Sequence, residues 1–192
     1  MARAGLAPAT VVEAAADLAD ETGFDHLSMG KVADRLGVRT PSLYKHVEGL
    51  DDLAHRIAVL AAHELSDTIR DATQGRSARE ALAAAARAMR AFVNEHPGRY
   101  AAINAARRTG SDDPLEVPTA RFLASFAAVL HGYRLDPAQE VHAMWMLRSM
   151  LHGFADLELA RGFQLDTDVD ESFTWLLDFV DRGLRALVAD SP

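Results

Sequence analysis

The sequence contains no cysteine, which excludes disulfide bonds, thiolate metal sites and thiol-based catalysis. It also lacks any run of about 18 apolar residues, the length that a membrane-spanning helix needs. Its first residues carry no apolar stretch of the kind that forms a signal peptide. From these absences we expect a cytoplasmic protein with no membrane partner.

Positive charge is scarce, since 20 lysine and arginine residues stand against 28 acidic ones and the net charge is −8. This balance argues against a protein that coats nucleic acid without specificity. The chain's two lysines, Lys31 and Lys45, nevertheless fall close together beside Arg35 and Arg39, with Asp34 as the one acid among them. The pattern favours a local contact with DNA, although a chance cluster on a solvated surface would look the same.

Helix is the regular structure that the sequence predicts throughout. Hydrophobic residues make up 49% of the 192 positions, which is enough for a packed core. Alanine runs such as residues 83–86 favour helix, and no segment shows the strict alternation of a half-buried strand. We therefore expect an all-α fold.

Two short helices joined by a tight turn carry the strongest functional signal. Ser28 can cap a helix over residues 29–36, Gly37 permits the turn, and Pro41 opens a further helix over residues 41–47. This spacing is that of a helix-turn-helix, whose second helix presents its N-terminal residues to the major groove of DNA. An ordinary helical hairpin is the competing interpretation, but it would not need so many donors on one exposed turn. The residues expected to face outward are Arg39, Thr40, Ser42, Tyr44, Lys45 and His46.

Start and stop signals divide the chain into two parts. Thr10 and Glu13 have the spacing of a capping box, so we expect the first helix to begin at Thr10. Asp51 and Asp52 suit the positive end of a fourth helix, which we expect to run to a break at residues 74–76. The expected parts are a helix-turn-helix DNA-binding domain over residues 1–50, a connecting helix over residues 51–73, and an effector-binding and dimerisation domain over residues 75–192.

The segments 27–38 and 40–47 closely resemble the N-terminal domain of the TetR family of transcriptional regulators. The similarity covers about residues 8–58. It implies a homodimer that binds double-stranded operator DNA, with base edges contacted by Thr40, Pro41 and Ser42 and phosphates reached by Tyr44 and His46. Ser28 and Lys31, at the start of the second helix, complete the candidate DNA-binding residues.

Two positions depart from the family pattern. Many members carry a phosphate-binding lysine at the start of the fourth helix, where this chain has Leu50. Some members place a base-reading side chain at the start of the second helix, where this chain has Gly30. These departures keep open an alternative in which the protein is a helical scaffold or partner-binding protein with a vestigial helix-turn-helix.

The segment 145–158 resembles the C-terminal domain of the TetR branch that is named for Trp, His and Gly. His96-Pro97 and the segment 171–173 fit that branch too. The resemblance implies that this half binds an effector and forms the dimer through its last two long helices. Gly153 lies in mid-helix, which costs about 1 kcal/mol relative to alanine, so we expect a helix to pack closely against it. The residues expected at the dimer interface, on the apolar stripe of the last helix, are Phe173, Leu176, Val180 and Leu184.

An effector site is expected where polar groups meet apolar surface in the C-terminal half. Trp145, Arg148 and His152 combine one large aromatic ring with two hydrogen-bond donors on roughly one helix face. A packing role for His152 and a surface salt bridge for Arg148 are the simpler interpretations of those two residues, as a plain core is for the aromatic stripe. The full set of candidate effector-binding residues is Met89, Phe92, Tyr100, Phe122, Phe126, Trp145, Arg148 and His152.

Enzymatic chemistry has no visible basis in the sequence. No glycine-rich phosphate loop and no nucleophile elbow is present, and the eight histidines form no pair with metal-ligand spacing. We therefore expect no catalytic residues, no cofactor and no metal. The sequence predicts a ligand-responsive transcriptional regulator, a repressor released from a palindromic operator by a small-molecule effector of unknown identity.

Overall fold

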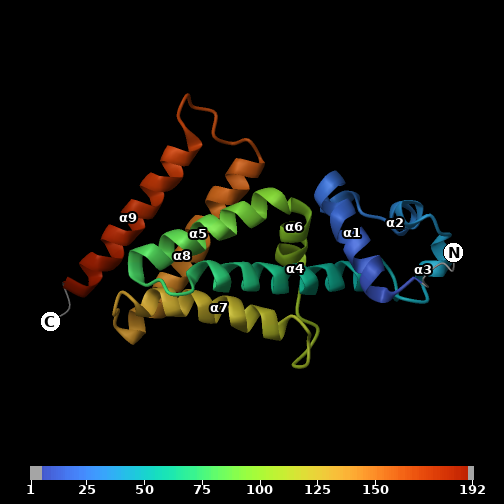
Figure 1. The fold of residues 1–192 in the computed structure, drawn as a ribbon, viewed down its shortest axis with the longest axis horizontal. Helices are drawn as coiled ribbons and strands as arrows, with labels where there is room; N and C mark the ends of the chain where they lie inside the picture. Colours follow the sequence, from blue (N-terminus) through green and yellow to red (C-terminus); the bar gives the residue numbers. More distant parts are fainter. Residues whose placement is uncertain (1–5, 190–192) are drawn as a thin grey trace. The chain divides into compact units, whose positions relative to one another are not determined.

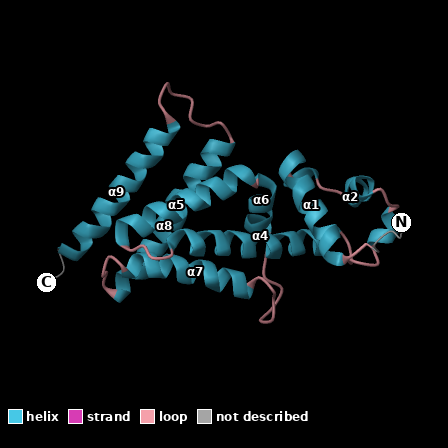
Figure 2. Cartoon of the chain, viewed as in Figure 1, coloured by secondary structure: helices cyan, strands magenta, loops and turns pink. Residues whose placement is uncertain are grey.

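The computed structural model describes residues 6–189, and all of their regular structure is helical (Figures 1 and 2). This confirms the predicted all-α fold. In that part of the chain, no helix has the length and apolar character that crossing a membrane requires. The elements are α1 (Pro8–Thr22), the 3₁₀ turn η1 (Phe24–His26), α2 (Met29–Leu36), α3 (Thr40–Leu43), α4 (Leu50–Thr73), α5 (Ala78–Glu95), α6 (Pro97–Ala105), α7 (Glu116–His131), α8 (Pro137–Leu159) and α9 (Val169–Ala189).

The chain divides into two compact units. The first comprises Met1–Glu64 and Glu95–Pro118, and the second comprises Leu65–Asn94 and Thr119–Pro192. Helix α6 thus belongs to the first unit, although its neighbours in sequence, α5 and α7, lie mainly in the second. The predicted functional domains are continuous stretches of sequence with a boundary at residue 50, so they did not include a return of the chain to the first unit. These functional domains stay a prediction.

The first unit is built on an apolar core shared by α1, α2, α3 and the first half of α4. Val11, Val32, Leu43 and Leu53 are completely buried in it. Each fully buried aliphatic side chain of this size contributes about 1.5–3 kcal/mol relative to an exposed one. Because every helix supplies at least one such residue, the core holds α2 and α3 in a fixed mutual geometry.

Two helix limits differ from the prediction. Helix α1 begins at Pro8 rather than Thr10, because proline is preorganised for the first helical position; no side chain caps this end. Helix α3 ends at Leu43 rather than Val47. There the amide of His46 donates to the oxygen of Leu43 at 2.8 Å, a tighter bond than an α-helix makes, so the chain turns early.

The second unit closes around aromatic rings from α8, α9 and the loop between them. The ring of Phe154 lies 4.7 Å from that of Phe163 and 4.9 Å from that of Phe173, measured between centroids. The guanidinium of Arg90, on α5, lies 4.8 Å from the centroid of Phe173 and donates two hydrogen bonds to Glu158 at 2.6 and 2.7 Å. These contacts tie α5, α8 and α9 into one body.

The apolar stripe expected at the dimer interface faces inward instead. Phe173, Val180 and Leu184 are 3%, 4% and 1% exposed, and Leu176 is half-buried. A side chain that is covered within its own protomer has little surface left for a partner, so Phe173, Val180 and Leu184 fit the intramolecular core, and Leu176 stays a candidate for the interface. The amphipathic pattern showed that α9 has an apolar face, but not what covers it.

The outward faces of α8 and α9 carry large apolar side chains. Trp145 on α8 and Trp175 and Phe179 on α9 are more than half exposed, and the rings of the last two stack 5.5 Å apart. A Cβ built on Gly153 meets nothing within 4 Å, so the expected close helix contact is absent within the described chain. Exposed apolar surface of this kind marks sites where other molecules dock.

Candidate nucleic-acid interface

Helix α2 is defined at both ends by local interactions that the sequence predicted. The hydroxyl oxygen of Ser28 accepts a hydrogen bond from the amide of Lys31 at 3.3 Å, which caps the helix. At the other end Gly37 adopts φ +64°, a left-handed conformation that a side chain would disfavour. The amide of Val38 then donates to the oxygen of Ala33 at 3.0 Å, which closes the helix and sets the turn.

The short helix α3 presents polar groups outward from a fixed base. Leu43, its last residue, and Val47, which follows it in the chain, are buried and anchor its C-terminal end. Tyr44 directly follows α3 and is 56% exposed. The other predicted contact residues are distributed as follows: Arg39, Pro41 and Lys45 are exposed, and Thr40, Ser42 and His46 are half-buried.

Not all the positive charges of this region are available to a ligand. Arg35 forms a bidentate ion pair with Glu21, at 2.6 and 2.7 Å, and the Lys31 ammonium donates to the main-chain oxygen of His26 at 2.8 Å. The side chains of Arg39 and Lys45 make no ion pair with any residue that the structure describes. The charge that faces outward therefore sits on the turn before α3 and just after α3, not along α2.

A clamp that the sequence reasoning missed fixes the end of the α3 segment to α4. Arg56 donates from Nη1 to the main-chain oxygen of His46 at 3.2 Å and from Nε to Asp52 at 2.9 Å. Asp52 in turn accepts from the amide of Glu48 at 2.9 Å. Burial opposes ionisation of Asp52, but these hydrogen bonds outweigh it and lower the pKa of the carboxyl. The clamp couples the position of α3 to that of α4.

Helix α6 is joined to α1 by a buried ionic cluster. The Arg99 side chain is 9% exposed and pairs with Asp20, with Asp17 at 2.8 Å and with Glu64 at 3.3 Å. Its amide also donates to Asp20 at 2.8 Å, and His96 contacts the same carboxylate at 3.1 Å. The cluster brings α1, α4 and α6 together around one guanidinium.

The loop after α6 is tied to α4 by a second buried carboxylate. Asp113 accepts hydrogen bonds from the amides of Leu115 and Thr109, at 2.8 and 2.7 Å. His55, on α4, contacts it at 3.0 Å. The bonds from the Leu115 and Thr109 amides lower the pKa of Asp113 to about 2. The N-terminal end of α6 is therefore held to α1 and α4, and the loop after α6 is held to α4.

The candidate effector residues lie in both units and differ in their exposure to solvent. Met89, Phe92 and Phe126 are buried, and the ring of half-buried Phe122 lies tilted against that of Phe126, 4.9 Å away between centroids. The remaining three candidates of the second unit lie along α8, where Trp145 and Arg148 are exposed and in cation–π contact at 5.7 Å, and His152 is half-buried. Tyr100 is buried in the first unit.

Comparison with protein families gives two matches along the chain. Residues 11–57 match the bacterial regulatory proteins of the tetR family, and residues 82–180 match the tetracyclin repressor-like C-terminal domain. Two relatives span nearly the whole chain, and both are called uncharacterized HTH-type transcriptional regulators. Rv0681 of Mycobacterium tuberculosis is 34% identical over 95% of this chain and 83% of its own length, and YobS of Bacillus subtilis is 31% identical over 95% and 94%.

The fold is shared with solved structures of the same kind. BioQ, in its complex with its natural double-stranded DNA operator, superposes with a TM-score of 0.69 at 21% identity, over 94% of this chain and 99% of that one. A capped α2, a glycine turn and an exposed α3, followed by a larger helical unit, define a helix-turn-helix transcription regulator. The chain belongs to the TetR family of bacterial transcriptional regulators, which are DNA-binding proteins and not enzymes.

Proposed function

We propose that this protein is a repressor that binds a palindromic operator through α3 and the turn before it. The observation that carries this proposal is the pair of outward-facing cations, Arg39 and Lys45, on either side of α3 and without an ion-pair partner in the described chain. Phosphate contacts supply most of the affinity of such proteins for DNA, and side chains at base edges supply specificity. Thr40, Pro41 and Ser42 are the residues proposed for the second role.

The operator-binding form is a two-fold dimer in this proposal. Trp175 and Phe179 on α9 and Trp145 on α8 supply an apolar surface, and the two helices pack against each other. Two such pairs make a four-helix bundle around a two-fold axis. A dimer of this kind presents two copies of α3 to half-sites about one turn of DNA apart, roughly 34–36 Å.

A small-molecule effector bound in the second unit would release the operator by moving the first. Of the candidate effector-binding residues, Met89, Phe92 and Phe126 are apolar and lie in the buried core of the second unit. Two links support the coupling. Helix α4 runs through both units. Helix α6 is held to α1 by Arg99, and the chain segments before residue 95 and after residue 118 belong to the second unit. Coupling between such sites typically amounts to about 1–3 kcal/mol.

Two finer assignments belong to the same proposal. We infer that the C-terminal half belongs to the TetR branch named for Trp, His and Gly, on the strength of Trp145, His152 and Gly153. We also infer that the protein acts in the cytoplasm, where its DNA target would lie.

The proposal is tested by fluorescence anisotropy with the DNA upstream of the protein's own gene. We expect Arg39→Ala and Lys45→Ala each to weaken binding and to reduce the slope of log affinity against log salt by about 1. Arg121→Ala, at an exposed arginine of the second unit, is the matched control and is expected to leave both quantities unchanged. Wild-type protein that binds this DNA no better than unrelated DNA would favour the scaffold alternative.

A further inference from the structure

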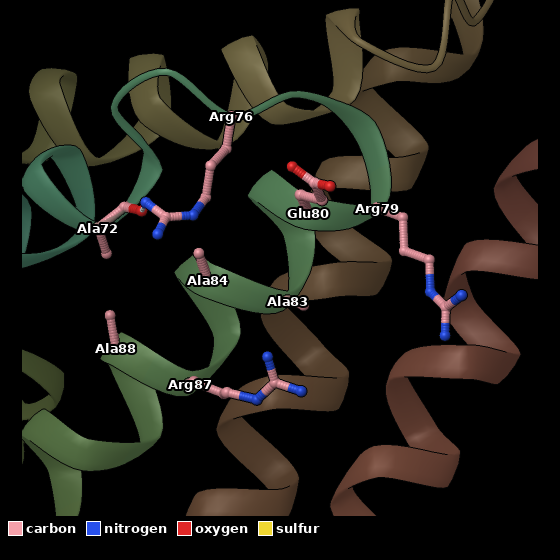
Figure 3. Close-up of a pocket in the computed structure, with 8 residues that line it drawn as sticks. All are labelled: Ala72, Arg76, Arg79, Glu80, Ala83, Ala84, Arg87 and Ala88. Carbon is pink, nitrogen blue, oxygen red and sulfur yellow. Dashed lines mark hydrogen bonds between the residues drawn. The ribbon is translucent and has the colours of Figure 1, made fainter.

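A shallow hollow lies where the end of α4 meets the first half of α5 (Figure 3). Its volume is about 810 Å³. Four alanines, Ala72, Ala83, Ala84 and Ala88, form much of its lining. Because alanine ends at Cβ, these positions leave open the space that longer side chains would fill on an ordinary outward helix face.

The rest of the lining is charged and mostly positive. Three arginines, Arg76, Arg79 and Arg87, surround the hollow together with a single acid, Glu80. The lining is therefore positive in a chain whose net charge is −8. Figure 3 shows these side chains arising from the α4–α5 connection and from successive turns of α5.

Two of the three arginines keep their charge unpaired. Arg76 donates to a neutral group, the main-chain oxygen of Ala72, at 2.8 Å. Arg87 makes no ion pair with any residue between 6 and 189. Arg79, by contrast, pairs with Asp178 on α9 at 2.6 Å. Arg76 and Arg87 thus have guanidinium donors available to an acceptor from outside.

The arginines that stabilise this unit behave differently. Arg90 pairs with Glu158 at 2.6 Å and Arg185 with Asp181 at 3.0 Å. A guanidinium left unpaired beside an open hollow is suited to a carboxylate or phosphate, which it can bind through two parallel hydrogen bonds.

We propose that this hollow binds a small organic anion with an apolar body. The anionic group pairs with Arg87, Arg76 adds positive charge beside Ala72, and the apolar part lies over Ala83 and Ala84. The site is independent of the buried aromatic core considered for the effector and of the DNA-binding surface. If no anion binds in this hollow, operator binding and the proposed function are therefore unaffected.

The test is isothermal titration calorimetry on the full chain with octanoate as the probe. Inorganic phosphate supplies the anion without an apolar body, and octylamine supplies the body with the opposite charge. We expect one octanoate to bind per chain, more tightly than either of the other probes. The variant carrying both Arg76→Met and Arg87→Met should bind octanoate about tenfold more weakly or worse, because charge-assisted hydrogen bonds are lost.

Arg121→Met, which removes an exposed arginine from α7, is the matched control and should bind octanoate as the wild type does. Circular dichroism should show the same helix content in all variants, since the three replaced side chains are exposed. The proposal is overturned if octanoate binds no better than phosphate or octylamine. It is equally overturned if the doubly substituted protein, or Arg87→Met alone, binds octanoate with wild-type affinity.

Discussion

Gly98 lies directly against the backbone of Ala19, where a Cβ on the glycine would stand 2.1 Å from the carbonyl carbon of Ala19. No real Cβ occupies such a position, so any side chain at residue 98 must push α6 away from α1. The contact is between backbones, which cannot rotate aside as a flexible side chain can. The joint between α1 and α6 is therefore a rigid one.

We expect Gly98→Ala to destabilise the protein by about 1–3 kcal/mol, the usual cost of overpacking. Alanine is a better helix former than glycine, so any loss of stability would come from the contact with Ala19 and not from a weaker helix. The measurement is the urea midpoint of unfolding. Gly110→Ala is the control, since a Cβ at that residue meets nothing within 4 Å. Equal midpoints for the two variants would show that α6 can shift without cost.

Arg99→Met should lower the free energy of unfolding far more than Arg35→Met does. Arg99 is buried against the equally buried Asp20, so its removal leaves that carboxylate as an uncompensated buried charge, at a cost of about 3–5 kcal/mol. Arg35 forms an exposed pair with Glu21, and such pairs contribute about 0–1 kcal/mol. Urea unfolding of both variants measures the difference. Similar losses would mean that the Arg99 cluster is no more than a surface salt bridge.

Asp113 should make stability depend on pH at the acid end. Its pKa is about 2 in the folded protein against 3.8 ordinarily. A depressed carboxyl pKa gives stabilisation that is fully present above pH 3.8 and is lost as the pH falls towards 2. We therefore expect the difference in unfolding free energy between wild type and Asp113→Asn to be constant from pH 6 to about 4 and to shrink below that. A difference that stays constant down to pH 3 would contradict the assigned shift.

Neighbouring residues of α9 should respond to the same substitution in opposite ways. Phe179 is 53% exposed and Val180 is 4% exposed. Phe179→Glu should keep the fold but weaken dimerisation by about 2–4 kcal/mol, as loss of a central aromatic contact does. Val180→Glu should instead unfold the second unit, because it buries an unpaired charge. Sedimentation velocity and circular dichroism separate the two outcomes.

The control for this pair is Leu165→Glu, which places the same charge at a residue that is 83% exposed and lies outside α9. It should remain dimeric and folded. A Phe179→Glu protein that is still dimeric at micromolar concentration would show that the dimer interface does not lie on the exposed face of α9.

Local signals allowed the sequence to predict α2 and its turn. Ser28 and Gly37 act within their own helix, so their effect can be read without knowing what surrounds them. The inward stripe of α9 was recognised as apolar but was assigned to a partner, because periodicity does not say which molecule covers a face. The Arg99 cluster was missed altogether, since it joins residues about 80 positions apart in the chain. Sequence spacing carries no trace of such a contact.

Binding-site selection from random duplex DNA determines whether two copies of α3 bind two half-sites of one operator. We expect enrichment of a palindrome whose half-site centres lie about 10–10.5 base pairs, or a multiple of that, apart. It also predicts that Thr40→Ala and Ser42→Ala each change the favoured base at one position per half-site, by about 1–3 kcal/mol. No enriched sequence, or one without two-fold symmetry that both variants leave unchanged, would show that α3 does not bind an operator in this way.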